Sequence, residues 1–232
     1  SDTEQRIKCK VESVGVPLKE WDVEIYRGVL TGCNDAFIIT SEKRDEILAN
    51  CIDEDERVRT AELIRPILRG RDIKKYGYEF ADQYIIATFP SRKYNIDEYQ
   101  SLKSYFLSFG IEKLEQTGKE YIINGEIVKA RKKTNNKWFE TQDSISYWDE
   151  FSKPKIVWGN LNTFGSYAIA PENMFINAPA CMIVPGNTYL LAVLNSKIAD
   201  YYLRTLGVVR NGGFFEYKPM FVEQIPIPKI TT

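Results

Sequence analysis

The sequence predicts a single domain of the α+β class. Segments that indicate strands and segments that indicate helices do not alternate regularly along the chain, so a doubly wound parallel sheet is not expected. The chain has 232 residues, of which 44% are hydrophobic, and this is enough to bury a substantial core. Its last segment, 225–230, contains two prolines and therefore cannot form a helix, so we expect an extended strap there.

The first half of the chain is predicted to form short strands followed by helices. Apolar residues partly alternate from 21 to 40, but turn-forming residues interrupt them at 31–35. Asp53 can accept a hydrogen bond at a helix start and Glu56 follows three residues later, as in a capping box, and Pro66 should end that helix. The expected elements are two strands within 21–40 joined by a loop at 31–35, a helix at 42–50, and a helix from 53 to about 64.

The second half contains the clearest helical pattern, at 189–206. Leu191, Leu194 and Ile198 recur at steps of three and four residues, and we expect Leu194 and Ile198 to be buried against a sheet. Gly207 is a typical helix stop. The other expected elements are a strand at 83–89, a helix at 97–116, a loop or short projecting hairpin at 118–137, and strands at 155–158, 167–170 and 181–184.

The composition excludes several kinds of catalytic site. The chain has no histidine, so neither a Ser-His-Asp triad nor a His-based zinc site can form. The four cysteines are not paired at CxxC spacing, and we interpret them as reduced thiols in a cytoplasmic protein. No GxGxxG or GxxxxGK(S/T) motif is present, nor the (N/D/S)PP(Y/F/W) loop that adenine-specific amino-methyltransferases use. There is no run of about 20 apolar residues, so no membrane span is expected.

Charge is balanced over the whole chain but not along it. With 31 basic and 32 acidic residues the net charge is −1, which argues against a freestanding nucleic-acid binder. However, five bases and one acid lie at 65–75, and again five bases and one acid lie at 126–137. Such segregation is typical of a surface that faces phosphates. The alternative interpretation is a pair of solvated charged faces.

Three segments carry residue types that suit nucleic-acid binding. In the turn at 69–75, arginines and lysines surround Gly70, which has no Cβ to keep the backbone away from a groove. Trp138 directly follows the second basic segment, and its ring could stack on bases. Residues 209–215 form a glycine-rich loop. The structural alternatives are a charged turn held by Asp72, core packing of the tryptophan, and a plain turn at 209–215.

Five blocks, in order along the chain, resemble one protein family. They are 28–39 (GVLTGCNDAFII), 67–76 (ILRGRDIKKY), 151–158 (FSKPKIVW), 194–202 (LNSKIADYY) and 223–228 (EQIPIP). Together they resemble the opening, the RGRDIKRY signature, the KPKI strand, the LNSK helix and the IPIP end of the TaqI-like C-terminal specificity domain. The resemblance covers nearly the whole chain.

The resemblance implies an α+β fold with a twisted, mostly antiparallel sheet, flanking helices and DNA-facing loops. It also implies that 21–230 is the DNA target-recognition domain of a type IIG restriction enzyme or adenine-specific DNA methyltransferase, with 1–20 as a linker from an upstream methyltransferase domain. The chain itself would then have no catalytic activity and no cofactor, whereas S-adenosylmethionine and Mg²⁺ would be needed by the other domains. The expected partners are double-stranded DNA and the protein's own methyltransferase domain, with no membrane.

Two other functions remain open at this point. One is the specificity module of a multi-subunit type I restriction system, which would need long helical spacers. The other is a protein-interaction domain without DNA binding, which the neutral net charge would suit. The residues expected to contact DNA are Thr31, Asn34, Arg69, Arg71, Lys74, Lys75, Arg131, Lys132, Lys133, Lys137, Trp138, Arg210 and Asn211.

Overall fold

The computed structural model describes residues 1–207 and 209–230, and its helices and antiparallel sheets confirm the α+β class. Val208, inside the predicted domain at 21–230, lies outside the described residues. The chain forms two compact units where the sequence predicts a single domain. Unit 1 comprises residues 1–28, 68–80 and 149–232, and unit 2 comprises residues 29–67 and 81–148.

A four-stranded antiparallel sheet, in the order β12-β10-β14-β2, forms the centre of unit 1. Both β10 and β14 are buried along their whole length, which explains why their sequences are almost uninterrupted apolar runs. The fully buried ring of Trp158 donates from Nε1 to the carbonyl oxygen of Tyr217 at 2.7 Å, so its polar atom is satisfied. The strands are β2 (Glu24–Arg27), β10 (Lys155–Trp158), β12 (Tyr167–Ala170) and β14 (Cys181–Val184), the last three with the predicted bounds.

Lys155 places a charged side chain inside this sheet. Its ammonium group donates to the carbonyl oxygens of Phe151 and Pro171 at 2.6 and 2.7 Å. Burial lowers the pKa of Lys155 to about 8. The lysine therefore ties β10 to η5 (Trp148–Ser152) and to the segment after β12, and it is not available on the surface.

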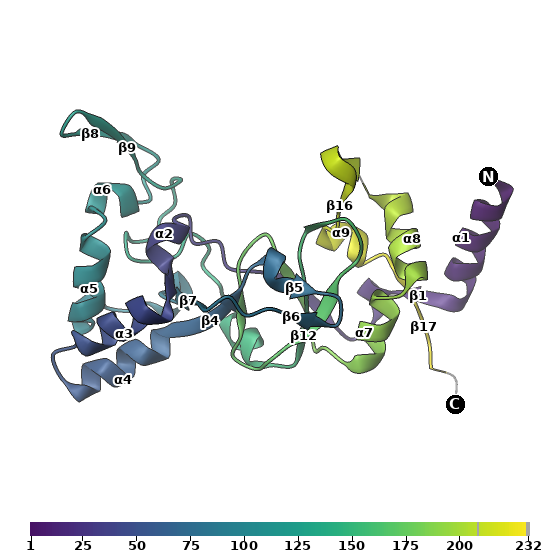
Figure 1. Cartoon of the computed structure of the whole chain (residues 1–232), viewed down its shortest axis with the longest axis horizontal. Coiled ribbons are helices and arrows are strands. Elements are labelled where there is room, and N and C mark those ends of the chain that lie inside the picture. The colour runs from purple at the N-terminus through teal and green to yellow at the C-terminus, as the bar shows by residue number, and fades with distance from the viewer. Residues whose placement is uncertain (208, 231–232) are drawn as a thin grey trace. The chain divides into compact units, whose positions relative to one another are not determined.

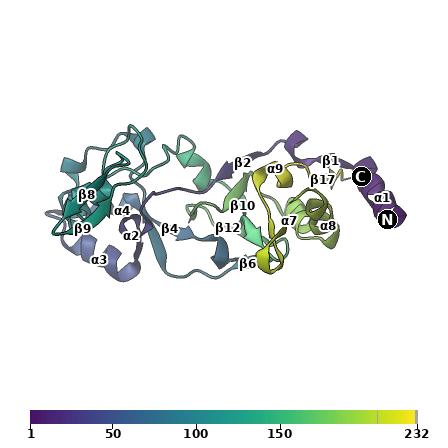
Figure 2. The same ribbon diagram turned by 90° about the horizontal axis from the view of Figure 1, so that it is seen from above.

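The remaining elements of unit 1 surround the sheet (Figures 1 and 2). Strand β1 pairs antiparallel with β17, and Leu18 is buried, so residues 15–20 are part of unit 1 although they lie in the segment predicted as a linker. The elements are α1 (Asp2–Val14), β1 (Gly15–Pro17), η1 (Leu18–Glu20), η2 (Gly70–Asp72), β5 (Ile73–Lys74), β6 (Gly77–Tyr78), β11 (Leu161–Asn162), β13 (Phe175–Ile176), α7 (Thr188–Leu194), α8 (Lys197–Leu206), β15 (Val209–Arg210), η6 (Asn211–Gly213), β16 (Phe214–Glu216), α9 (Pro219–Val222) and β17 (Pro226–Pro228), with η5 (Trp148–Ser152) at the boundary.

Helices α7 and α8 replace the single helix predicted at 189–206. The side chain of Asn195 accepts from the backbone nitrogen of Tyr167 at 3.0 Å and donates to its oxygen at 2.9 Å, and Ser196 caps α8. The distant backbone of Tyr167 thus holds the side chain of Asn195, the local cap of Ser196 starts a new helix, and the helix is broken between the two segments. Leu194 is buried as predicted, but Ile198 is 52% exposed, so its predicted burial is wrong.

Unit 2 packs helices against a small antiparallel sheet in which β7 lies between β4 and β3. Asp53 caps α4 as predicted, accepting from the backbone nitrogen of Glu56 at 2.8 Å. Pro66 lies within β4 and does not end the helix, which stops at Leu63. The elements are α2 (Asn34–Phe37), β3 (Ile38–Thr40), α3 (Ser41–Ala49), α4 (Glu54–Leu63), β4 (Ile64–Leu68), β7 (Gln83–Ile86), η3 (Pro90–Arg92), η4 (Ile96–Glu98), α5 (Gln100–Leu107) and α6 (Ile111–Leu114).

Two expectations about unit 2 need correction. The segment predicted as a loop at 31–35 contains the start of the short helix α2. The helix predicted at 97–116 is divided into η4, α5 and α6. Gly110, with a φ of 83°, separates α6 from α5, which ends at Leu107. The apolar stripe of that segment nevertheless faces the core, where the rings of Phe37 and Phe106 lie 4.9 Å apart.

The hairpin predicted within 118–137 is present as β8 (Glu120–Ile123) and β9 (Glu126–Lys129). Asn124 and Gly125 form its two-residue turn, with φ values of 50° and 84°, as a type I′ turn requires. Figure 1 shows that the hairpin projects beyond α6, away from the helices of unit 2. Elsewhere, none of the described helices is both long enough and apolar enough to cross a membrane.

Candidate nucleic-acid interface

The turn at 69–75 is held together by its own acid. The carboxylate of Asp72 accepts from the backbone nitrogen of Arg69 at 2.8 Å and from two guanidinium nitrogens at 2.9 and 2.8 Å. Burial by itself would raise the pKa of Asp72, but the hydrogen bonds and the charge of Arg69 lower it overall. The guanidinium group of Arg69 is therefore bound by Asp72. For this residue the structure matches the alternative interpretation, a charged turn held by Asp72.

The rest of this turn is only partly available to a ligand. A Cβ at Gly70 would lie 3.3 Å from the Cα of Gly159, so the missing side chain allows a close approach of the chain's own backbone. The ammonium group of Lys74 donates to the carbonyl oxygen of Arg71 at 2.9 Å. Arg71 and Lys75 are exposed, and neither forms a salt bridge with any residue that the structure describes. The turn can therefore offer Arg71 and Lys75 to a polyanion.

Arg131, which the sequence places among the DNA-contacting residues, is buried in this structure and bonded to its own chain. The residue is 4% exposed, and its guanidinium group lies over the ring of Phe37 at 5.0 Å. All three guanidinium nitrogens donate inward, which leaves none for a phosphate or a base. Burial lowers the pKa of Arg131 to about 10, so the group stays charged at neutral pH. The accepting carbonyl oxygens are those of Thr31, Leu114, Trp138 and Glu140, at 2.7 to 2.8 Å.

Thr31 and Trp138 are also structural rather than DNA-facing in this structure. Thr31 is fully buried, and its hydroxyl donates to Oδ1 of Asn34 at 2.7 Å and accepts from the backbone nitrogen of Cys33 at 3.1 Å. The ring of Trp138 packs edge-on against that of Phe106 at 6.5 Å in the core of unit 2. Asn34, which accepts from Thr31, is itself exposed.

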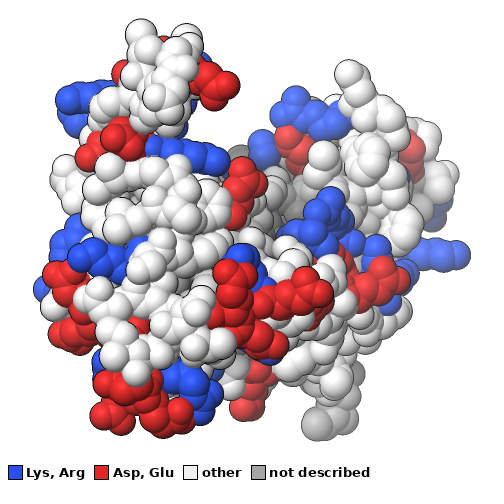
Figure 3. All heavy atoms as spheres, turned by 60° about the vertical axis from the view of Figure 1, so that its left-hand side comes forward, with Lys and Arg blue, Asp and Glu red and all other residues white. Residues whose placement is uncertain are grey.

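The cations that follow the hairpin are available. Lys132, Lys133 and Lys137 are exposed, and none of them forms a salt bridge with another residue in the described part of the chain. Lys137 lies 5.6 Å from the ring of Phe139, a weak contact that leaves its charge accessible. In Figure 3 the projecting end of the hairpin is mostly uncharged surface, with charged side chains of both signs below it. These three lysines therefore remain candidates for phosphate contacts.

In the glycine-rich loop at 209–215, one predicted residue is ion-paired and another is accessible. Nε of Arg210 donates to the carboxylate of Glu216 at 2.6 Å, and Lys218 pairs with the same carboxylate at 2.7 Å. These two cations, Lys218 first, lower the pKa of Glu216. Asn211 is exposed at the bend that Gly212 makes with a φ of 78°. Arg210 is therefore occupied, and Asn211 is the accessible predicted residue.

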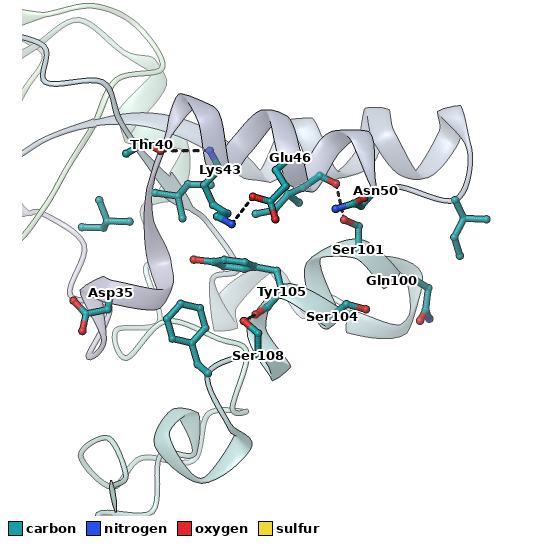
Figure 4. A pocket seen from close by; sticks show the side chains of 15 residues that line it. Asp35, Thr40, Lys43, Glu46, Asn50, Gln100, Ser101, Ser104, Tyr105 and Ser108 are labelled. Atoms are coloured by element: carbon teal, nitrogen blue, oxygen red, sulfur yellow. Dashed lines mark hydrogen bonds and ion pairs between the residues drawn. The ribbon is translucent and has the colours of Figure 1, made fainter.

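A hollow of about 810 Å³ lies between α3 and α5 in unit 2 (Figure 4). Its polar groups have partners of their own: Thr40 caps α3, the hydroxyl of Tyr105 donates to the carbonyl oxygen of Ala36 at 3.1 Å, and Lys43 pairs with Glu46. Exposed acids on its wall make it unfavourable for phosphate. Among the described residues, no cluster of three or more acids or cysteines could hold a metal ion. The hollow therefore carries no catalytic arrangement.

Sequence reasoning missed one unusual surface, the outward face of the hairpin. Ile122 and Ile127 form a cross-strand pair there and are 82% and 66% exposed. A signal for it was present, because Asn124-Gly125 is the strongest short-range hairpin motif and fixes which side chains share a face. Counting back from that turn by the two-residue period places both isoleucines on one face.

Comparison with known proteins places the chain in a family. Residues 65–227 match the model of the TaqI-like C-terminal specificity domain. The fold is similar to that of the type IIG restriction endonuclease BpuSI, with a TM-score of 0.57 and 14% identity over 99% of this chain and 26% of that one. It is also similar to the type IIL restriction-modification enzyme MmeI, solved in complex with DNA, with a TM-score of 0.53 and 12% identity over 90% of this chain and 25% of that one.

No curated protein sequence matches the chain. The chain spans about a quarter of the length of the two structural neighbours, and at these identities the likeness to them establishes the fold alone. The family model, in contrast, matches more than half of the chain and contains the turn at 69–75 and both helices α7 and α8. The chain therefore belongs to the TaqI-like C-terminal specificity domain family.

Proposed function

We propose that the chain is the DNA target-recognition domain of a longer restriction–modification enzyme. Membership of a specificity-domain family supports this role, as does the fold shared with BpuSI and with MmeI, the latter solved in complex with DNA. Recognition of a target site requires phosphate contacts that set register and side chains that reach base edges. It does not require a catalytic centre within the same domain.

The observation that carries this proposal is the set of exposed lysines after the hairpin. Lys132, Lys133 and Lys137 carry charges that no carboxylate of the described residues neutralises. Unit 2 also holds an acidic stretch, with eight acids against four bases at 42–62, so its surface is segregated rather than uniformly charged. A polyanion would be attracted to the lysines and repelled from the acidic helices.

Methylation and cleavage then belong to other parts of the longer protein. The target adenine would be flipped out of the base stack by a methyltransferase domain, with S-adenosylmethionine bound there and Mg²⁺ used for cleavage. That methyltransferase domain is the second proposed partner, besides double-stranded DNA. The chain alone should transfer no methyl group from S-adenosylmethionine to DNA, and radiolabel incorporation by the purified chain would contradict this division of labour.

The test of the DNA role is a salt-dependent binding measurement with the purified chain. The logarithm of its binding constant for duplex DNA should fall linearly with the logarithm of salt concentration, and Lys132→Ala with Lys133→Ala should reduce that slope by about 0.9 per lost contact. Lys43→Ala, on the acidic helix α3 and already paired with Glu46, is the matched control and should leave the slope unchanged. Absence of salt-dependent binding by the wild-type chain would overturn the proposal.

A further inference from the structure

The hairpin β8–β9 presents one face to its own unit and the other to solvent. Side chains alternate between the faces, as the two-residue period of a strand requires. On the inner face the hydroxyl of Tyr121 donates to Glu115 at 2.7 Å, and Tyr121 is paired with Val128. The outer face carries the register pairs Glu120 with Lys129 and Ile122 with Ile127.

The outer face is apolar where a solvated strand would be polar. Ile122 and Ile127 lie directly opposite each other in the second cross-strand pair from the turn, and they are 82% and 66% exposed. A two-stranded hairpin has no second layer to cover such a pair, and an exposed apolar pair at a projecting tip is typical of a contact surface. Solvation alone does not explain two isoleucines at these positions.

The charges around the pair select a polyanion as the occupant. The segment 118–137 contains six bases and two acids; Arg131 is buried, and Glu120 pairs with Lys129 at 3.0 Å. Four lysines without a carboxylate partner among the described residues therefore flank the pair, and within 118–137 Glu126 is the one acid that forms no ion pair with a described residue. These lysines are Lys119, Lys132, Lys133 and Lys137.

We propose that the outer face of this hairpin enters the major groove of DNA, where Ile122 and Ile127 contact the 5-methyl groups of thymines. The inference rests on the proposed function and names the reading element within it. The major groove admits a two-stranded β-ribbon, and thymine presents there the one apolar group of the base-edge code. The lysines then lie near the phosphates at the edge of the groove, where they fix the position of the hairpin along the duplex. The isoleucines discriminate thymine from cytosine.

Replacement of thymine by uracil tests this contact atom by atom. A duplex selected by the chain from a random-sequence pool is prepared with deoxythymidine and again with deoxyuridine, which lacks only the methyl group. The wild-type chain should bind the thymine duplex about fourfold more tightly for each contacted methyl, the factor expected for burying one methyl-sized group. Affinities are measured by fluorescence anisotropy at fixed salt.

Variants assign the effect to the hairpin. Ile122→Ser with Ile127→Ser should bind the two duplexes equally, because the side chains that sense the methyl group are gone. Ile52→Ser removes an isoleucine that is equally exposed, at 74%, beside the acidic helices, and it should retain the full difference between the duplexes. Circular dichroism spectra and unfolding midpoints of all variants should match those of the wild type, since each side chain is exposed.

Three results would overturn the inference. A wild-type chain that binds both duplexes equally makes no methyl contact, and a serine variant that keeps the full difference makes it elsewhere. Sedimentation that shows self-association of the wild type, abolished by the serine substitutions, would assign the pair to a protein partner. In each case the proposed function stands if Lys132→Ala with Lys133→Ala still weakens binding, whereas loss of all salt-dependent binding would remove the proposed function itself.

Discussion

Two basic segments look alike in the sequence but are used differently in the structure. Each contains five bases and one acid, at 65–75 and at 126–137. In the first, Asp72 lies three residues after Arg69 and binds it through a local turn. In the second, the buried base is Arg131, and its partners are backbone carbonyl oxygens from distant parts of unit 2.

The comparison shows that the hydrogen-bond acceptors around a basic side chain, rather than the number of basic residues in the segment, decide whether that side chain is accessible to a ligand. Arg69 forms an ion pair with Asp72, three residues later in the sequence, and Arg131 is buried in the core. The bases that remain accessible, Lys75 in one segment and Lys132 and Lys133 in the other, have no such acceptor among the described residues.

Removal of Arg131 should unfold or strongly destabilise unit 2. Arg131→Ala leaves four carbonyl oxygens without their donor in a buried site, and we expect a loss of about 3–5 kcal/mol in the free energy of unfolding. Urea denaturation measures this change. Lys132→Ala, its neighbour in the sequence, is the control and should change stability by no more than about 0.5 kcal/mol. Equal effects of the two substitutions would show that the burial of Arg131 does not matter.

Removal of Asp72 should loosen the other segment by a smaller amount. Asp72→Ala deletes the acceptor of three hydrogen bonds from Arg69, which is itself partly exposed, so we expect a loss of about 1–3 kcal/mol. The same substitution frees the guanidinium group of Arg69 and should strengthen non-specific DNA binding by the folded variant. Weaker binding by a variant that is still folded would mean that the turn itself is part of the interface.

The accessible lysines should affect binding and not folding. Lys132→Ala with Lys133→Ala should weaken DNA binding at low salt. For each lost contact, a fourfold rise in salt should then cost the variant about 3.5-fold less affinity than it costs the wild type, following the slope of 0.9 per phosphate. Arg71→Ala with Lys75→Ala provides the same test for the turn at 69–75. If a side chain of either pair reads a base, affinity should instead fall for one target position and specificity should relax there. Unchanged affinity and slope in a stable pair would remove that segment from the interface.

Acid should weaken the turn at 69–75, and this is the smallest effect that we expect. The pKa of Asp72 is lower in the folded state than the unfolded value of about 3.9, so its stabilisation is complete above that value. It is lost as the pH falls through the lower folded pKa, because the protonated carboxyl no longer pairs with Arg69. The difference in unfolding free energy between wild type and Asp72→Asn should therefore shrink below about pH 4. A difference independent of pH would show that charge does not hold the turn.

Local chemistry made much of the fold predictable. Strands β10, β12 and β14 have the predicted bounds because each is a short apolar run enclosed by Gly, Pro or Asn. The caps of α3 and α4 and the hairpin turn at Asn124-Gly125 follow from residues within four positions of one another. The candidate site was predictable to the same extent: the basic segments are on the surface, and the turn held by Asp72 could be anticipated from its spacing.

The α+β class, the short-range elements, the charge segregation and the resemblance to a specificity domain therefore follow from the sequence alone. Which residues of the basic segments are accessible depends on the folded chain, because the partners are remote: Arg131 donates to Thr31, 100 residues earlier. The same holds for the break after α7, where Asn195 bonds Tyr167, and for the exposure of Ile198 that follows. It holds also for the division into two units, since unit 2 is assembled from two stretches of chain that no local pattern joins. Side-chain chemistry sets what a residue can bond, but the fold sets which acceptors reach it.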